Sequence, residues 1–499
     1  MKQLLQLFFL FQIQFVFCQQ NVDSIDYQDL LMLKPSSTFS TIANKLNRIK
    51  ERQTKEQFTV LHFGDSHIQG DFFSGEVRSL LQSEFGHAGQ GIIFPYSLCK
   101  SYGPKGVRVT SKGTWTGTNI LKNTEKMNVG VAGYTLYTAN ANSELSFEIT
   151  DKFTGKVSNR ISIWTNADSN TIEYKLNDGL RLVGESQIAP NLNVRTYESD
   201  SLISFFNLSL IKSTNAGNKF YFHGFEYEFE EESGINYHHL GVVGAQFTHL
   251  IYNADLAKKQ IQQLKPDLVI FSFGTNEAYD QKVDTNFYYS SISKFIESTK
   301  AIVPNVEFLL TTAPDTRSQG RIPPNQQTVN RQIVRLADNL DLSLFDLNQA
   351  MGGWGSLKRW YDNKLTLADK LHFNVQGYKL QGKMLSFAIL NEYNRFSSNP
   401  NKVDMLKLSD DLQVGLKPIL IQEINTSSDS LIVNKEPESK TVVINKTKPK
   451  TVLYTVKSGD TISEIARKHK VSIQKILVAN RMKESSIIRP GQKLVIPKS

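Results

Sequence analysis

Two hydrophobic patterns alternate along the chain, and the first of them predicts an α/β domain. Phe58 to Phe63 and Leu268 to Phe273 are almost continuously apolar, which is typical of strands that a parallel sheet buries on both faces. Apolar residues recur at helical spacing from Phe73 to Phe85, and again from Phe247 until Pro266 ends the helix. The same order predicts helices over about 289–302, 326–340 and 376–393, and strands over 306–312 and 342–347.

The second pattern has a period of two and fills the region from about Leu98 to Glu232. Apolar and polar residues alternate over 145–150 and over 225–230, as expected for half-buried antiparallel strands. We therefore predict a β-sandwich inserted into the α/β domain. Some of its aromatic residues suit either a packed core or stacking on sugar rings. These are Trp115, Tyr134, Tyr137 and Trp164.

A change of composition marks the region after the last predicted helix. Residues 397–450 are rich in Ser, Asn, Lys, Asp and Glu with scattered Pro, which predicts a flexible linker. Residues 431–433 and 442–444 are apolar enough for short strands within it. A chain of 499 residues also exceeds one ordinary core, so a division into about three units is expected.

The N-terminus has the pattern of a secretory signal peptide. Lys2 is followed by a short apolar run to Phe17, shorter than the ~20 residues that cross a bilayer. We expect cleavage near residue 19, with lipidation of Cys18 as the alternative. If Cys18 is removed, Cys99 is the only thiol, so no intrachain disulfide forms. No later segment is predicted to span a membrane, and the expected location is the periplasm or the cell surface.

The positive charge of the chain is unevenly placed. The formal net charge is +9, and Lys and Arg are dense from Lys435 to Lys498. A basic tail suits an anionic polymer, either nucleic acid or a cell-wall surface, or is simply a soluble basic surface. The signal peptide favours the wall, and we predict no nucleic-acid partner.

A serine stands where the first predicted strand turns into a helix, in Gly64-Asp65-Ser66. On such a turn its hydroxyl projects and its backbone N–H is free to help bind an oxyanion. Alone, the tripeptide is better explained as an ordinary Asp/Ser turn that caps the next helix.

Three further segments follow in a meaningful order: Gly241-Val242-Val243-Gly244-Ala245, Gly274-Thr275-Asn276 and Asp369-Lys370-Leu371-His372. With the serine segment they resemble the four sequence blocks of SGNH (GDSL-like) hydrolases, over about residues 55–97 and 238–395. The rival α/β-hydrolase arrangement lacks its G-x-S-x-G pattern here. Each segment alone also suits an ordinary turn, cap or surface pair, but their joint order favours the hydrolase.

The resemblance implies a role for each residue. Ser66 is the nucleophile, His372 takes and returns its proton, and Asp369 holds the imidazole in the useful tautomer. The N–H groups of Ser66 and Gly244, with the amide of Asn276, form the oxyanion hole. Other histidines near these segments, among them His62, His67, His238, His239 and His249, do not have the spacing of a metal site. We predict no metal and no cofactor.

Residues 453–498 resemble a LysM domain, from Tyr454-Thr455-Val456 to the closing Val495-Ile496-Pro497. The resemblance implies binding of N-acetylglucosamine-containing chains such as peptidoglycan. Contacts are expected from two loops, and the residues predicted there are Gly459, Asp460, Thr461, Ile462, Ala479 and Asn480. Binding of protein alone is the alternative for this module.

The expected fold is α/β, a three-layer SGNH hydrolase with a parallel sheet, an inserted β-rich domain and a C-terminal LysM module. The expected parts are a signal peptide (1–19), the hydrolase domain in two pieces (24–97 and 238–396), the carbohydrate-module-like insert (98–237), the linker (397–450) and LysM (451–499). The insert position also resembles peptidoglycan O-acetylesterases, which implies removal of O-acetyl groups from the glycan. The alternatives are an esterase or acetyltransferase for another acetylated polysaccharide, and a non-catalytic wall-binding scaffold.

Overall fold

The structure is a computed structural model, and it divides into two compact units, Met1–Asp429 and Ser430–Ser499. It describes residues 31–499 apart from 123–128, 151–156, 168–171, 214–217, 230–231, 253, 319, 398–399, 430–450, 458–459, 461, 470, 472, 481, 483–491 and 498–499. The predicted signal peptide with Cys18, and the two short strands predicted at 431–433 and 442–444, lie outside the described residues.

A seven-stranded sheet forms the centre of the first unit, in the order β1-β17-β16-β15-β2-β14-β3. Its strands are β1 (Leu33–Lys34), β2 (Gln57–Gly64), β3 (His87–Gly89), β14 (Gly234–Gly241), β15 (Leu268–Ser272), β16 (Glu307–Thr311) and β17 (Ser343–Phe345). All neighbours pair in parallel except β1, which is antiparallel to β17. The predicted parallel sheet is therefore confirmed, with one antiparallel edge strand added.

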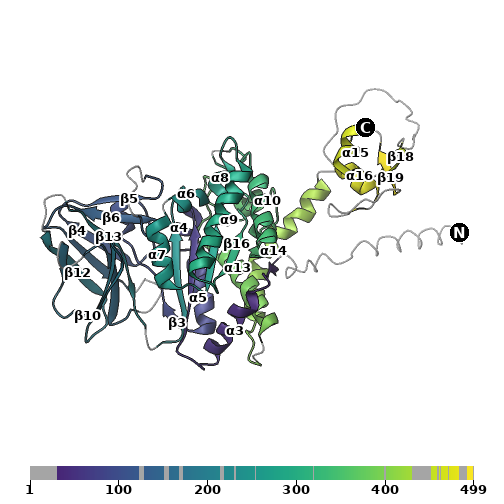
Figure 1. The fold of residues 1–499 in the computed structure, drawn as a ribbon. Helices are drawn as coiled ribbons and strands as arrows, with labels where there is room; N and C mark the ends of the chain where they lie inside the picture. Colours follow the sequence, from purple (N-terminus) through teal and green to yellow (C-terminus); the bar gives the residue numbers. More distant parts are fainter. Residues whose placement is uncertain are drawn as a thin grey trace. The chain divides into compact units, whose positions relative to one another are not determined.

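Helices cover both faces of this sheet, as the continuous apolar strands predicted. On one face, Val60 and Ile270 join a core with α3 (Phe39–Lys50), α5 (Phe73–Phe85) and α13 (Val375–Phe396). On the other, Leu61 and Phe271 join a core with α6 (Phe247–Tyr252), α7 (Ala254–Leu264), α9 (Thr285–Ile302) and α10 (Gln326–Asn339). Figure 1 shows the sheet between these helices. The α/β architecture is thus a three-layer one.

One helix is longer than its apolar pattern indicated. Helix α9 begins at Thr285, four residues before the predicted start, because Asp284 caps it. The Asp284 carboxylate accepts the backbone N–H groups of Asn286 and Phe287 at 3.1 and 3.0 Å. A capping carboxylate satisfies N–H groups that have no partner within the helix. The predicted strand at 342–347, by contrast, shortens to Ser343–Phe345.

The region between β3 and β14 forms two antiparallel sheets packed face to face. In Figure 1 they lie to the left of the seven-stranded sheet and its helices. The six-stranded sheet contains β5 (Thr116–Asn119), β6 (Tyr134–Thr138), β8 (Arg160–Thr165), β10 (Arg181–Ala189), β11 (Leu192–Glu198) and β13 (Phe220–Tyr227). The four-stranded sheet contains β4 (Val107–Lys112), β7 (Glu144–Ile149), β9 (Ile172–Leu176) and β12 (Phe205–Ser213). Stacked Phe147 and Phe206 meet Phe225 edge-on between them.

The alternation predicted over 225–230 is wrong at Glu226. Glu226 is buried, because β13 is covered on both sides, and its carboxylate accepts the indole N–H of Trp164 at 3.0 Å. Phe229 lies just after the strand. Among the four candidate sugar-stacking residues, Tyr134 and Trp164 are core residues, with exposed fractions of 0% and 2%.

The predicted border between the insert and the second hydrolase piece is misplaced. Strand β14 begins at Gly234, and Gly234 pairs with Gln57 at the start of β2. The insert therefore ends before Gly234 rather than at residue 237. Sequence reasoning missed this because Ile235 and Tyr237 continue the alternation of the preceding strands.

The linker predicted over 397–450 is wrong for its first part. Helix α14 (Leu406–Asp429) packs on α13, and its Leu412, Leu416 and Ile419 are buried in the core of the first unit. The two helices approach closely at Gly415, where an added Cβ would lie 2.8 Å from the Leu380 side chain. Residues 430–450 lie outside the described part.

This packing gives a stability prediction. We expect Leu416→Ala to lower the free energy of unfolding by about 2–5 kcal/mol, because it leaves a cavity beneath α14. Val414, which is 77% exposed on the same helix, is the matched control, and Val414→Ala should change it by less than about 0.5 kcal/mol. Urea unfolding measures both values, and equal small effects would show that α14 does not stabilise the unit.

The second unit has the order β18 (Thr451–Thr455), α15 (Ile462–His469), α16 (Ile473–Ala479) and β19 (Lys493–Pro497). The two strands pair antiparallel, and Val456, Ile465 and Ile476 belong to a core that contains residues of this unit only. Within the described residues of the whole chain, no helix combines the length and apolar character needed to cross a bilayer.

Candidate active site

Three neighbouring strands end at the same level and carry the loops of the site. Gly64 at the end of β2 pairs with Gly241 of β14 on one side and with Ser272 of β15 on the other. The predicted serine, glycine and asparagine segments follow these three ends directly. Because parallel strands present their carboxyl ends at one edge, segments far apart in sequence meet there.

Ser66 opens the short helix α4 (Ser66–Gln69), and Asp65 is its N-cap. The Ser66 hydroxyl lies 2.9 Å from Nε2 of His372, although the two residues are 306 positions apart. Nδ1 of His372 lies 2.7 Å from Oδ2 of Asp369. The structure therefore brings the three predicted triad residues into one hydrogen-bonded line, with the geometry that proton transfer from a serine needs.

The chain holds Asp369 and His372 together locally. A bridge between Thr366 and Phe373 closes a tight loop, whose residue Lys370 has a φ of 57°. Within it, Oδ1 of Asp369 accepts the backbone N–H groups of Leu371 and His372, both at 3.0 Å. Partial burial acts to raise the pKa of Asp369, but these bonds and the bond from the His372 ring outweigh it and lower the pKa. The carboxylate thus stays ionised beside the ring.

Two of the predicted oxyanion donors are backbone N–H groups, those of Ser66 and Gly244, and the local backbone leaves them accessible. The N–H of Ser66 is among the first of α4, and such groups have no partner within their helix. Gly244 has a φ of 79°, a conformation that favours glycine. Among the described residues, an added Cβ there would meet only the Leu121 side chain within 4 Å, at 3.8 Å, which leaves the backbone at Gly244 open to a substrate on the described side.

The third predicted donor, Asn276, lies in α8 (Thr275–Ala278). Its Nδ2 donates to the carbonyl of Ala245 at 2.9 Å, which ties the asparagine to the glycine loop. The same nitrogen lies 3.4 Å from Oδ2 of Asp65. The amide is therefore fixed between the serine turn and the glycine loop, and its second N–H lies on the serine side.

Two buried carboxyl groups under the site were not predicted. Glu277 accepts the N–H of Phe247 at 2.8 Å and that of Gly274 at 3.1 Å, so it joins the glycine and asparagine loops. Burial raises the pKa of Glu277 to about 7. Asp65 accepts the N–H of His67 at 2.9 Å, and burial, with the charge of Glu277 adding to it, raises the pKa of Asp65 to about 8. The capping position of Glu277, three residues after Gly274, was the available signal.

The raised pKa of Asp65 makes the free energy of unfolding depend on pH. Its native pKa of about 8 exceeds the ordinary 3.8, so the native protein holds a proton that the unfolded chain releases. The free energy of unfolding should therefore fall as pH rises from about 4 to about 8, and Asp65→Asn should flatten this slope. Urea titrations across that range test it. Asp411, whose pKa the Lys383 hydrogen bond lowers, provides the control Asp411→Asn, which should keep the wild-type slope.

The other nearby histidines are held away from the serine. His62 contacts the Tyr237 hydroxyl through Nδ1 at 2.7 Å and the Ser272 hydroxyl through Nε2 at 2.8 Å. His67 contacts the Tyr378 hydroxyl at 3.0 Å, and burial lowers its pKa to about 3. A neutral His67, with its ring centre 5.7 Å from that of His372, adds no charge against a protonated His372.

The described residues of the LysM loops have mainly structural contacts. Asp460 accepts from the Tyr454 hydroxyl at 2.8 Å and from the N–H of Lys457 at 2.7 Å. The Asn480 amide joins α16 to β19 through Ile476 and Val495. The side chain of Asn480 is thus occupied by the fold, while Gly459 and Thr461 lie outside the described residues.

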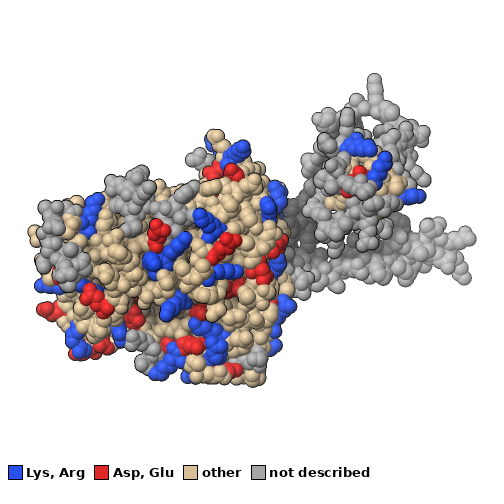
Figure 2. Space-filling model, viewed as in Figure 1, with Lys and Arg blue, Asp and Glu red and all other residues tan. Residues whose placement is uncertain are grey.

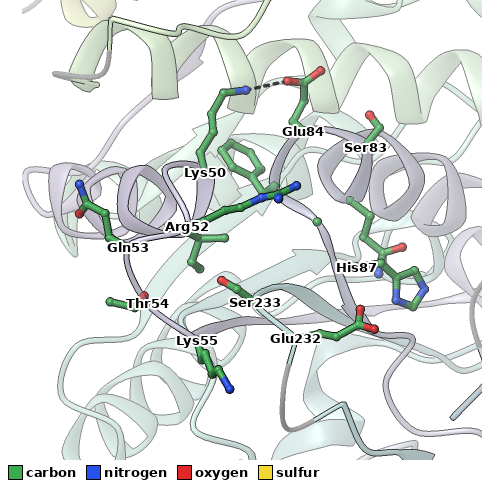
Figure 3. Close-up of a pocket in the computed structure, with 14 residues that line it drawn as sticks. Lys50, Arg52, Gln53, Thr54, Lys55, Ser83, Glu84, His87, Glu232 and Ser233 are labelled. Carbon is green, nitrogen blue, oxygen red and sulfur yellow. Dashed lines mark hydrogen bonds and ion pairs between the residues drawn. The ribbon is translucent and has the colours of Figure 1, made fainter.

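A hollow of about 730 Å³ lies at the other edge of the sheet. Figure 3 draws the side chains that line it. It is lined by residues that precede β2, β3 and β14, among them Arg52, Lys55 and Ser233. Its Lys50 and Glu84 form an ion pair at 2.9 Å. Since Ser66 follows the opposite end of β2, this hollow is not part of the serine site. Among the described residues, no group of three or more His, Cys, Asp and Glu is arranged to hold a metal ion.

Comparisons with known proteins agree with this fold. Residues 200–380 match the GDSL-like Lipase/Acylhydrolase family, a range that contains Gly244, Asn276, Asp369 and His372 but not Ser66. Residues 454–497 match the LysM domain.

Among solved structures, a peptidoglycan O-acetylesterase is similar with a TM-score of 0.59 and 20% identity, over 72% of this chain and 97% of that one. A lipase/acylhydrolase from Enterococcus faecalis has a TM-score of 0.27 and 20% identity, over 33% of this chain and 80% of that one. A carbohydrate esterase family 3 protein from Talaromyces cellulolyticus has a TM-score of 0.26 and 18% identity, over 34% of this chain and 75% of that one. At 20% identity the likeness to the peptidoglycan O-acetylesterase concerns the fold alone.

The fold is that of an SGNH hydrolase, and the serine-containing site and the match over residues 200–380 support a carboxylic ester hydrolase. This chain carries a GDSL-like acylhydrolase domain, interrupted by a β-sandwich, and a C-terminal LysM domain.

Proposed function

We propose that this protein is a serine esterase that removes O-acetyl groups from a cell-wall glycan, with peptidoglycan as the substrate. The observation that carries the proposal is the line of hydrogen bonds from Ser66 through His372 to Asp369, in a chain that also contains a LysM domain. The fold shared with a peptidoglycan O-acetylesterase, including its extent over 97% of that protein, supports the choice of substrate.

The proposed reaction follows from the positions of three side chains. Oγ of Ser66 attacks the ester carbonyl carbon while Nε2 of His372 accepts the hydroxyl proton. The bond from this carbon to the sugar oxygen then breaks, and His372 returns the proton to that oxygen. Water adds to the acetyl-serine in a second cycle of the same steps and releases acetate. Asp369 fixes the ring tautomer and stabilises its positive charge throughout.

The oxyanion of each tetrahedral intermediate would be bound by the N–H groups of Ser66 and Gly244 and the amide of Asn276. The contacts of Asn276 with Ala245 and Asp65 orient that amide before substrate arrives. Donors that are oriented in advance stabilise developing charge without a reorganisation cost.

The C-terminal unit would retain the enzyme on its polymer. On the face drawn in Figure 2, Lys and Arg of the first unit are interspersed with Asp and Glu. The positive excess lies in residues 430–499, which hold fifteen Lys and Arg against five Asp and Glu. Such a charge suits an anionic wall surface, and we propose export to the periplasm or the cell surface. Retention on the wall raises the local concentration of ester.

The decisive experiment measures acetate released from purified cell wall. The full chain should release acetate from O-acetylated peptidoglycan, and none from the same wall after chemical deacetylation. Release only from another acetylated polysaccharide would redirect the proposal to that substrate. Transfer of acetyl to an added glycan, without free acetate, would identify a transferase.

Removal of residues 430–499 should separate retention from chemistry. The truncated protein should bind sedimented wall at least about tenfold more weakly, because multivalent retention is lost. Its turnover of the small soluble ester 4-nitrophenyl acetate should be unchanged, since the LysM core contains residues of its own unit only. If the truncated protein lost both wall binding and turnover of the small ester, the two units would not act independently.

A further inference from the structure

A cavity of about 310 Å³ lies beside the proposed active site, within the first unit. Its walls come from the segment that enters the sandwich, from strand β4 and from strand β14. This volume is at the lower end of the range of sites that hold small organic molecules. The residues that matter here are Tyr96, Tyr102, Val107, Val109 and His239.

One wall of the cavity contacts the turn that carries the nucleophile. The Tyr102 hydroxyl donates to the carbonyl of Ser66 at 3.4 Å. The Tyr102 carbonyl accepts from the side chain of Gln69, in the same helix α4, at 2.6 Å. Because Tyr102 joins the two, a substrate unit in this cavity would be a neighbour of the unit that presents its ester to Ser66.

Two buried polar side chains of the lining, Tyr96 and His239, have atoms without hydrogen-bond partners in the part of the chain that the structure describes. The Tyr96 hydroxyl and both ring nitrogens of His239 have no hydrogen-bond partner among the described residues, and each residue is only 3% exposed. Their ring centres are 6.1 Å apart. On the neighbouring strand, by contrast, both ring nitrogens of His62 have partners. Since buried polar groups are nearly always hydrogen-bonded, those of Tyr96 and His239 are available to a partner that enters the cavity.

The lining is neutral and partly apolar. Among the described residues that line it, none is Lys, Arg, Asp or Glu. Burial lowers the pKa of His239, so its imidazole is uncharged at neutral pH, and burial raises the pKa of the Tyr96 hydroxyl. Val107 and Val109 supply the apolar wall from β4. The nearest charges that act on His239, Asp71 and Arg78, pair with each other at 2.7 Å, so a charged ligand would lose its hydration here without gaining a free counter-charge, and a neutral ligand is favoured.

We propose that this cavity binds a neutral N-acetylated sugar unit of the glycan, next to the unit whose ester is cleaved. The Tyr96 hydroxyl donates to the acetamido carbonyl, a ring nitrogen of His239 accepts from the acetamido N–H, and the methyl group packs on Val107 and Val109. The inference rests on the proposed function, because it names a subsite for the same glycan.

Two variants of the full chain test the subsite by kinetics. Tyr96→Phe removes a hydroxyl that has no protein partner, and Val109→Phe fills the cavity. We expect Tyr96→Phe to raise the KM for acetylated glycan about fivefold, because one hydrogen bond to the sugar is lost. Val109→Phe should raise this KM further, because the larger side chain occupies the space of the sugar. Both should leave kcat and KM for 4-nitrophenyl acetate unchanged. Tyr289→Phe on α9, and Thr110→Phe on the outward face of β4, are the matched controls.

A second measurement does not depend on turnover. In the Ser66→Ala protein, the imidazole resonances of His239 should shift when a tetramer of β-1,4-linked N-acetylglucosamine is added, and Val109→Phe should abolish the shift. No shift, or an equal loss for both esters in the kinetic test, would overturn the subsite. If wild-type protein releases no acetate from wall but the His239 shift is present, the proposed function fails while the neutral sugar site stands.

Discussion

Ser66→Ala should reduce kcat for 4-nitrophenyl acetate by about 10⁴- to 10⁶-fold. The substitution removes the oxygen that lies 2.9 Å from Nε2 of His372, so no acyl-enzyme can form. The residual rate would come from the oxyanion donors and from substrate positioning alone. Initial rates at saturating ester, with the protein concentration raised to detect the residual activity, measure the effect.

The control is Ser74→Ala. Ser74 is a buried serine of the neighbouring helix α5, whose hydroxyl bonds to Asp71 at 2.8 Å and does not contact the site. It should retain most of the wild-type kcat. Circular dichroism should show that both variants are folded. Wild-type turnover in folded Ser66→Ala protein would mean that another group is the nucleophile.

Asp369→Asn should lower kcat by about 10²- to 10⁴-fold with a much smaller effect on KM. An asparagine amide facing Nδ1 of His372 favours the tautomer that protonates Nε2, and Nε2 is then no longer a base toward Ser66. The lower bound reflects the 45% exposure of the Asp369 side chain, because water there replaces part of the stabilisation. The pH–rate profile on the small ester, together with kcat and KM, tests this.

Asp362→Asn is the comparison for Asp369→Asn. Asp362 is a carboxylate that pairs with Lys358 at the surface, and it should leave kcat unchanged. Equal kcat in wild-type and Asp369→Asn proteins would show that the imidazole is oriented by other contacts. An equal rise in KM with unchanged kcat would place Asp369 in substrate binding instead.

The parts of the fold that sequence predicted well are those in which one local pattern decides the outcome. Helix α5 has the bounds that its apolar spacing indicated, Phe73–Phe85. The strand at Leu268 is buried along its whole length, as continuous apolar residues require. The block order placed four distant segments together, and they do meet at one edge of the sheet.

The parts that were missed depend on contacts that a local pattern does not record. Helix α14 was hidden by its polar composition, although Leu408, Leu412 and Leu416 recur every four residues and could have revealed it. Glu226 is buried only because the outer face of the sandwich is covered, which no alternation on its own strand indicates. Glu277 and the cavity at His239 involve side chains brought together from several elements.

Because the sandwich is inserted between β3 and β14, its position in the chain affects the order in which parts of the protein fold. His62 of β2 and Tyr237 of β14 contact each other across 175 positions, most of them within the sandwich. Strand β14 can dock only after this long loop closes, and such non-local pairing is slow. Regain of esterase activity on dilution from denaturant should therefore lag behind the recovery of sandwich structure, and the unpaired edge of β2 is exposed to aggregation during that interval.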